Sequence, residues 1–513
     1  MANPVAGPMP AGVVKQTNAA WRNYGGNLQT PVGALYVLTN GLTNDANVGL
    51  KAIVWAIREV GATGGSLSSS GARWSFSAAA VNTGAMIDIR AMAKKLGFNP
   101  SHLANPADAV SLVQVQGGTS IEQLIAYAEG AGRSLKAMGG NCGQTIAGAI
   151  STGTKGGFVD QQGFPDMVRA LYLVGEDGSL FWLERGGARR VISDSMEAML
   201  TAAHVKVVRD DALFNHAVVS LGAFGVIYAV VLETAPAYAV KLSRTRMDFD
   251  DALDAATFDN DFARIGAGRP LDFAAVINPY RMKETDGKWR GSGAAWVTQL
   301  FPMPQGTATT LGGPGVSLND ADLSNILATF ASASPADIPG LMDLLIPVLY
   351  GGREAQGPFP VAYPLALTHA PTLGMEIAVS STDARAMLGE ILKYVHAAPK
   401  PIAGALSIRQ TLKSEATLSA ARWPRTFTFE WGCLAVPGTE ELLAGLLDAL
   451  EATGIPFALH LGQLVGNGWL TRARLDAMYG AEAVEAWVQG RKTTCPTGKV
   501  FGSQLTRALG LTP

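Results

Sequence analysis

The chain has 513 residues, more than one hydrophobic core usually organises, so two or three packed units are expected. Apolar residues make up 48% of it and charged residues 16%, which excludes a disordered protein. With 40 basic against 42 acidic residues, the charge balance gives no indication of nucleic-acid or anionic-membrane binding.

No targeting or membrane segment is predicted from the sequence. Residues 1–14 contain three prolines and lack the basic start and apolar run of a signal peptide, and no apolar run long enough for a membrane span follows. The cysteines Cys142, Cys433 and Cys495 are odd in number and fit no metal-ligand spacing, so neither a disulfide framework nor a metal site is expected. We therefore expect a cytoplasmic protein.

The N-terminal half opens with a helix and a first glycine-rich segment. A helix is predicted between a cap at Asn44 or Asp45 and Gly61, because apolar residues recur there at helical spacing. Residues 64–77 then read GGSLSSSGARWSFS, which combines glycines, small hydroxyl side chains and one guanidinium group. Such a segment can wrap around phosphates.

A second glycine-rich segment, residues 139–157, reads GGNCGQTIAGAISTGTKGG. It has too many glycines for a regular helix and side chains too small for a core, so its backbone is expected to approach a ligand closely. The surrounding pattern predicts a helix over 121–128 and strands at 112–115, 170–174, 180–183 and 226–232, with a tight turn at Asp177-Gly178. Pro236 is expected to close this half.

Beyond about residue 241 a mixed pattern of helices and strands replaces the glycine-rich segments. Glycine- and proline-rich stretches at 301–315 and 350–364 are expected to be surface loops. Strands are predicted at 373–379, 406–412 and 426–431, since each alternates apolar and polar residues.

Each of these three strands has one face that carries polar side chains. Glu376 lies on the first such face, Ser407 and Arg409 on the second, and Glu430 on the third. If the strands are neighbours, their polar faces merge into one surface that can form the floor of a substrate cavity.

The glycine-rich segments carry the most informative chemistry. A dinucleotide pyrophosphate requires backbone N–H donors without intervening side chains, and glycines with neighbouring hydroxyls supply them. Either segment alone could instead be a flexible surface loop. Neither has the GxGxxG arrangement between strand and helix, so a Rossmann nicotinamide site is not predicted.

These segments resemble the vanillyl-alcohol-oxidase superfamily of FAD enzymes, particularly its branch of alditol and aldonolactone oxidases. GARWSFS at residues 71–77 is similar to the flavin loop of that branch, and TIAGAISTGTKGG at 145–157 to its pyrophosphate-facing loop. SLGAFGVI at 220–227 is similar to the segment at the adenine end, and the closing FGSQLTRALGL also fits in order. The resemblance is good over residues 18–240 and looser beyond them.

The resemblance implies an α+β protein with a PCMH-type FAD-binding domain of two subdomains and a substrate domain built on a mixed or antiparallel sheet with helices. The expected divisions are 18–240 for FAD, 241–461 for substrate, and 462–513 returning to the FAD domain. The cofactor-binding positions that it implies are Ser69, Ser70, Gly71, Ala72, Arg73, Trp74, Ser75, Ala149, Thr154, Gly157, Gly225 and Ile227.

One departure from the family concerns the attachment of the cofactor. Covalent members have a histidine where this chain has Trp74, between Arg73 and Ser75. An indole cannot form the histidyl-flavin bond, so the FAD is expected to be noncovalent.

Other departures concern the catalytic positions. Polyol oxidases of the family have a serine where this chain has Ala149, and a Glu-x-Arg pair where it has Ser407 and Arg409. Their threonine corresponds to Glu430, and their His-Trp-Gly-Lys segment corresponds to His460-Leu461-Gly462-Gln463. A polyol site needs many polar contacts, so a less hydroxylated substrate is expected.

The candidate catalytic residues are Arg409, Glu430 and His460. Arg409 can stabilise reduced flavin, or it can be a structural partner of Glu376 or Glu430. Glu430 is a candidate base, although pairing with arginine would lower its pKa. His460 can titrate near neutrality or be a structural hydrogen-bonding group. Glu376, Ser407, Arg409 and Gln463 are the candidate substrate-binding residues.

Several residues have two open interpretations. Trp74, Trp431 and Trp469 could line an apolar pocket or belong to the ordinary core. Lys155 could contact a phosphate or be solvated. The flavin chemistry implied is removal of a hydride from a C–H next to oxygen or nitrogen of a small molecule, with molecular oxygen or another acceptor reoxidising the flavin. The alternatives are oxidative cyclisation or another biosynthetic oxidation of a larger apolar molecule, and flavin binding without turnover.

Overall fold

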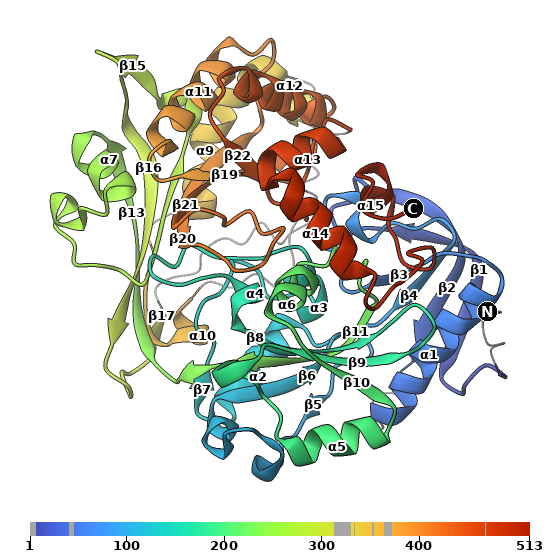
Figure 1. Cartoon of the computed structure of the whole chain (residues 1–513). Coiled ribbons are helices and arrows are strands. Elements are labelled where there is room, and N and C mark those ends of the chain that lie inside the picture. The colour runs from blue at the N-terminus through green and yellow to red at the C-terminus, as the bar shows by residue number, and fades with distance from the viewer. Residues whose placement is uncertain are drawn as a thin grey trace.

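The structure is a computed structural model that describes residues 7–39, 46–311, 330–332, 334–350, 353–363, 372–466 and 468–513. It combines helices with a four-stranded, a six-stranded and a two-stranded sheet from the N-terminal half and one large sheet from the second half (Figure 1). The predicted α+β class is confirmed. Within the described residues, every helix is too short or too polar to cross a bilayer.

The first sheet has four strands in the order β1-β2-β4-β3. An antiparallel hairpin that the sequence reading did not predict, β1 (Val13–Arg22) and β2 (Gln29–Leu38), continues into parallel β4 (Ala85–Asp88) and β3 (Leu67–Ser70). The predicted helix is confirmed as α1 (Ala46–Ala62), whose Ala52, Ile53, Ala56 and Ile57 are fully buried. Its expected cap lies outside the described residues. The first glycine-rich segment leaves this sheet at the end of β3.

The second sheet has six strands in the order β10-β9-β8-β11-β6-β5. All four strands predicted for this region are present, and Gly178 has the positive φ of +81° that the predicted turn requires. The strands are β10 (Val205–Arg209), β9 (Leu180–Glu184), β8 (Val168–Val174), β11 (Val226–Glu233), β6 (Leu112–Gln116) and β5 (Lys95–Leu96). Helices α2 (Ile121–Glu129), α5 (Asp194–Ala202) and α6 (Asp211–Val218) accompany them.

The large sheet runs β17-β18-β13-β16-β14-β20-β21-β19-β22, with β15 paired to β16. Its pairing is antiparallel throughout. The three strands predicted from alternation are β19 (Thr372–Ser380), β20 (Gly404–Leu412) and β21 (Arg425–Leu434), and they are neighbours as the merged polar face requires. The others are β13 (Ala239–Phe249), β14 (Asp272–Ile277), β15 (Lys283–Thr285), β16 (Lys288–Met303), β17 (Thr310–Leu311), β18 (Arg353–Pro358) and β22 (Phe457–Leu459).

Helices cover both faces of this sheet. Buried side chains of α11 (Ala384–Ala397) and α12 (Thr439–Ala452) join the apolar face of β19, β20 and β21 in one core, and α7 (Asp251–Phe258) packs beside β13. On the opposite, polar face, α9 (Ile338–Tyr350) packs over Val276 and Ala405. The rest of the polar face is turned toward the N-terminal half.

Two expectations about glycine-rich stretches are wrong. The second glycine-rich segment does contain a helix, α3 (Ile146–Ser151), because Ile146 and Ile150 lie one turn apart and are both fully buried. The stretch 350–364 is not a surface loop throughout, since it includes β18 and the short helix α10 (Phe359–Ala362), whose Phe359 is fully buried. In the stretch 301–315, β16 continues to Met303, and residues 312–315 lie outside the described residues.

The C-terminal segment crosses from the large sheet back to the first sheet (Figure 1, red). Helix α14 (Ala481–Arg491), preceded by α13 (Arg472–Tyr479), packs on α6, and the Leu67 backbone N–H donates to Val500 O at 2.6 Å. The last helix, α15 (Gln504–Ala508), packs beside residues 78–80. These contacts fit the predicted return of the C-terminal segment to the FAD domain. The boundaries 18–240, 241–461 and 462–513 remain a proposal. The first sheet begins at Val13, five residues before the first of these boundaries.

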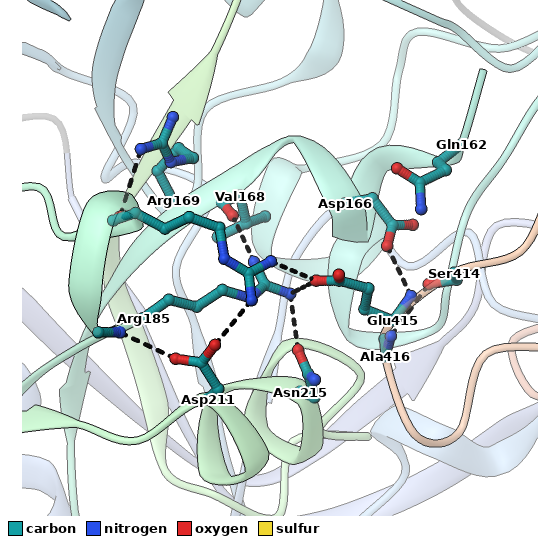
Figure 2. Close-up of polar contacts among 12 residues, drawn as sticks. Gln162, Asp166, Val168, Arg169, Arg185, Asp211, Asn215, Ser414, Glu415 and Ala416 are labelled. Carbon is teal, nitrogen blue, oxygen red and sulfur yellow. Dashed lines mark hydrogen bonds and ion pairs between the residues drawn. The ribbon is translucent and has the colours of Figure 1, made fainter.

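The loop of residues 413–424 between β20 and β21 also joins the two halves. Figure 2 shows Glu415 beside Arg185 and Asp166. A Glu415 carboxylate oxygen lies 2.8 Å from Arg185, and the Glu415 backbone N–H donates to Asp166 Oδ1 at 2.8 Å. This loop therefore fixes the far ends of β20 and β21 to the N-terminal half.

Candidate active site

A cavity of about 310 Å³ lies between the N-terminal half and the polar face of the large sheet. Segments distant in sequence line it, namely residues 69–80, 139–155, 221–227, 372–376 and 460–463, with side chains from β20 and β21. Among the predicted cofactor-binding positions, the lining includes Ser69, Gly71, Ala72, Arg73, Trp74, Ser75, Ala149, Thr154, Gly225 and Ile227.

The structure places the other two predicted cofactor positions outside this lining. Ser70 is fully buried, and its Oγ accepts a hydrogen bond from Trp21 Nε1 at 3.3 Å. Gly157 lies against β14, where an added Cβ would be 3.2 Å from Asp272 Oδ2. Both are therefore next to the cavity wall and not on its surface.

The two glycine-rich segments meet at the cavity as closely as their composition predicts. A Cβ on Gly71 would lie 2.0 Å from Thr145 Oγ1, so only glycine allows the two backbones to approach there. At Gly225, φ is +112° and a Cβ would lie 2.4 Å from Val174 O. Arg73 also has a positive φ of 65°, a strained backbone of the kind found at ligand sites.

Unpartnered buried polar atoms around this cavity fit a large polar ligand. Within the described residues, five such atoms belong to side chains of the lining: Arg73 Nε, Gln144 Oε1, Thr145 Oγ1, Trp431 Nε1 and Gln463 Oε1. Buried donors and acceptors normally have partners, so a group with many hydrogen-bonding atoms is expected to bind here. The glycine approach and these atoms together fit FAD.

Trp74 lies in the cavity lining and stacks on Tyr24. The ring centroids are 4.9 Å apart and the planes differ by 8°. Of the three tryptophans with open interpretations, Trp74 lines the cavity, Trp431 is in its lining and is also fully buried in the core, and Trp469 belongs to the core.

The predicted polar side chains come together across three adjacent strands. Glu430 lies directly opposite Glu376 on β19 and opposite Ser407 on β20. Arg409 is one pleat further along β20, and its Nη1 lies 2.7 Å from Glu430 Oε2. Gln463 Nε2 donates to Glu430 Oε1 at 2.8 Å. Glu430 is therefore held by both Arg409 and Gln463.

Lys155 is neither solvated nor a clear phosphate contact, because its side chain is buried and forms an ion pair with Glu376. Burial disfavours ionisation of Glu376, but the charge of Lys155, with that of Arg409, outweighs it and lowers the pKa of that carboxyl. The pair thus keeps Glu376 ionised in a buried position directly opposite Glu430. Sequence reasoning missed this because the partners are 221 residues apart.

His460 is buried in the cavity lining and lies beside Glu376, whose backbone oxygen accepts from the His460 N–H at 3.1 Å. Burial lowers the pKa of His460 below its ordinary value of 6.5, although Glu376 opposes this effect. Its Nδ1 accepts from the Gly462 N–H at 3.1 Å, which assigns the proton of the neutral ring to Nε2. In this tautomer His460 is a hydrogen-bond donor.

A second cavity, of about 370 Å³, adjoins the first. Residues Gly140, Asn141, Thr372, Arg409, Glu430 and Gly432 line both cavities, so Arg409 and Glu430 are the charged side chains at the junction. Much of the second cavity is apolar, with Val276, Met342, Leu345, Ile346, Ala403, Ala405 and Leu434 in its lining. Ser407 lines this cavity and not the first.

Comparisons with known proteins agree with this geometry. Residues 25–184 match the family described as FAD binding domain. Over 159 residues the chain is 30% identical to D-arabinono-1,4-lactone oxidase from Debaryomyces hansenii, a match that covers 29% of this chain and 24% of that relative. The chain therefore spans about a quarter of the length of this relative.

The whole fold is similar to that of solved oxidases. A mutant cholesterol oxidase from Brevibacterium sterolicum has a TM-score of 0.71 at 12% identity, with 99% of each chain covered. A solvent-stable cholesterol oxidase has a TM-score of 0.64 at 15% identity, with 95% of this chain and 98% of that chain covered. These likenesses show the fold alone.

Residues 25–184 thus form an FAD binding domain, and the resemblance to the vanillyl-alcohol-oxidase superfamily of PCMH-type FAD enzymes that the glycine-rich segments predicted is confirmed. Within that superfamily, the lactone oxidase match supports the predicted resemblance to the aldonolactone oxidase branch.

Proposed function

We propose that the protein oxidises a small, mainly apolar molecule by removing a hydride from a C–H next to a hydroxyl or amine. The observation that carries this proposal is that the Arg409–Glu430 pair lies where the FAD-like cavity meets the apolar second cavity. A substrate in the second cavity would present its reacting group to this pair.

Each charged group at the junction has a distinct role in this proposal. Glu430 accepts the proton that leaves the substrate hydroxyl or amine, and Arg409 orients Glu430 through the 2.7 Å contact. His460 Nε2–H donates a hydrogen bond to the substrate heteroatom. Bound FAD would accept the hydride, and molecular oxygen would be the final acceptor.

FAD in this site is proposed to be noncovalent. The residues that would hold it are those of the two glycine-rich segments, together with Gly225 and Ile227 of the same lining. Trp74 has no nucleophilic atom that could bond to the flavin. Acid precipitation of the purified protein should leave the yellow colour in the supernatant, and colour retained in the precipitate would contradict this proposal.

The substrate class can be tested by anaerobic flavin bleaching. A panel of aliphatic, cyclic and aromatic alcohols and amines is mixed with the FAD-loaded protein, and we expect at least one apolar member to bleach the flavin absorbance. Glu430→Gln should slow this reduction by about 100- to 10,000-fold while FAD stays bound. Glu354→Gln, an exposed position on β18, is the matched control and should leave the rate unchanged.

A second candidate function is oxidative cyclisation or another oxidation of a larger apolar molecule. The apolar part of the lining of the second cavity favours it, because apolar side chains such as Met342, Leu345 and Ile346 suit an extended hydrocarbon surface. Mass spectrometry of the product would separate the two: loss of two hydrogens without a new ring supports simple oxidation. Bound FAD that no member of the panel bleaches would instead support a flavin-binding protein without turnover.

A further inference from the structure

The second cavity contains a buried carboxylate whose position none of the proposed roles explains. Asp272, on β14, is 3% exposed, and it lines the cavity together with Tyr363 and Arg244. No described residue donates a hydrogen bond to its Oδ2. A buried carboxylate oxygen without a donor is costly, and proteins keep such groups mainly where a ligand completes them.

The neighbouring cations are engaged elsewhere. Arg409 lies opposite Ala274, two residues from Asp272 on the adjacent strand, so the two Cα atoms are a diagonal pair about 7–8 Å apart. Its guanidinium contacts Glu430 at 2.7 Å. Arg244 donates from Nε to Thr298 Oγ1 at 3.2 Å. The Gly157 backbone N–H serves the Asp272 carboxyl, so Oδ2 is the oxygen of this group that lacks a donor among the described residues.

The charge state of Asp272 fits an acceptor role at neutral pH. Burial raises the pKa of its carboxyl to about 6, while Arg409 and the Gly157 backbone N–H oppose that rise. The carboxyl is thus ionised at pH 7 and above. An ionised oxygen forms a stronger hydrogen bond than a neutral one, so a hydroxyl that reached it would gain affinity and specificity.

The wall between the junction and Asp272 is mainly apolar. Val276 from β14 and Met342, Leu345 and Ile346 from α9 form part of it. A ligand that fills this cavity therefore needs an apolar surface against this wall and polar groups where it meets Arg409 and Glu430 and where it meets Asp272.

We propose that Asp272 is a second polar anchor of the substrate cavity, and that the substrate carries an additional hydroxyl group, remote from the oxidised carbon, which donates a hydrogen bond to Asp272 Oδ2. This inference rests on the proposed function and narrows the substrate class to apolar skeletons with two hydroxyl groups. Discrimination by such an anchor is strong, because a ligand without the donor leaves a buried charge unsatisfied.

Matched probes test the anchor by binding. Each diol is paired with the alcohol that lacks its second hydroxyl: 1,6-hexanediol with 1-hexanol, 1,8-octanediol with 1-octanol, and 1,4-cyclohexanediol with cyclohexanol. The dissociation constant of each probe from the FAD-loaded protein is measured from the perturbation of the FAD absorbance. In Asp272→Leu we expect the diol-to-alcohol affinity ratio to fall by about tenfold or more for at least one pair, through weaker diol binding. An unchanged ratio for every pair, or no binding by any probe, overturns the proposal.

A stability measurement separates an anchor from a structural aspartate. Asp88 is equally buried but is held by Arg73 and Arg90, so Asp88→Leu should lower the thermal midpoint of the FAD-loaded protein. Asp272→Leu should leave the midpoint unchanged or raise it, because it removes an unsatisfied charge. A fall as large as that of Asp88→Leu overturns the proposal.

The outcomes for the anchor and for the proposed function are distinguishable. If alcohols bleach the flavin in both proteins and the affinity ratio does not change, the anchor fails and the oxidoreductase function stands. If the ratio changes but no probe or panel member bleaches the flavin, the anchor stands and the oxidation fails.

Discussion

At the scale of single residues, the buried pair of Lys155 and Glu376 governs the electrostatics of the site. Both side chains are almost fully buried, so each charge depends on the other. Glu376 also faces Glu430 across β19 and β21, and two carboxylates so placed would repel without compensation. Lys155 and Arg409 supply that compensation from two different segments.

We therefore expect Lys155→Met to be strongly destabilising. It leaves Glu376 as an unpaired buried charge, and the free energy of unfolding should fall by about 3–5 kcal/mol, measured by urea denaturation of the FAD-loaded protein at pH 7. The control is the double variant Lys155→Met with Glu376→Leu, which removes both charges and should recover most of the loss. A single variant as stable as the parent would show that Glu376 finds another partner.

Residue identities were only partly predictable from the sequence. Arg409, Glu430 and Glu376 were found because strand alternation places them on one face, and this pattern is local. The partner of Lys155 and the unsatisfied oxygen of Asp272 depend on segments more than 100 residues away, so no local pattern reports them. Which carboxylate pairs with which cation is thus a tertiary property.

At the scale of elements, strands were predicted correctly where they have one polar and one apolar face. A helix was missed where glycines interrupt a buried segment. The β19, β20 and β21 pattern is regular, whereas α3 has a glycine at its centre and a length of six residues. Its stability comes from burial of Ile146 and Ile150 and not from helix propensity, which glycine lowers. The β1–β2 hairpin was missed because β1 is exposed along most of its length and lacks the alternation of apolar and polar residues that marks a half-buried strand.

The loop of residues 413–424 offers a prediction about pH. Burial raises the pKa of Asp166 to about 6, while its bond from the Glu415 N–H and the charge of Arg185 oppose that rise (Figure 2). Because the folded protein holds this proton more tightly than the unfolded chain, Asp166 lowers stability as pH rises from about 4 to about 6, with no further change above.

Asp166→Asn should remove this pH dependence. The unfolding free energy of the variant minus that of the parent should be larger at pH 7 than at pH 4.5, by at most about 3 kcal/mol. Urea denaturation at both pH values measures it. Asp194→Asn, at an exposed position, is the control and should show a much smaller change. If the variant instead became less stable relative to the parent as pH rises, the loop would need the ionised carboxylate.

At the scale of the whole molecule, the cofactor cavity joins segments that are far apart in sequence. Its lining draws on both glycine-rich segments, on three strands of the large sheet and on residues 460–463. The Ser75 Oγ donates to Gly462 O at 2.8 Å, and the Phe76 N–H donates to the same oxygen at 2.9 Å, so the two halves already touch at the cavity rim. A ligand that fills the cavity therefore adds contacts to every part at once.

Removal of FAD should consequently destabilise the whole chain and not one lobe. A ligand that binds only the folded state stabilises it by RT ln(1 + [L]/Kd), which is about 2.7 kcal/mol at a hundredfold excess over Kd. The FAD-free protein should melt at a lower temperature in a single transition, and the midpoint should rise with each increment of added FAD. NAD is the control, because it shares the pyrophosphate and adenosine but lacks the isoalloxazine, and it should give little or no rise. An unchanged midpoint with FAD would contradict a cofactor site at the junction, and a rise confined to one of two separate transitions would show that FAD binds one half alone.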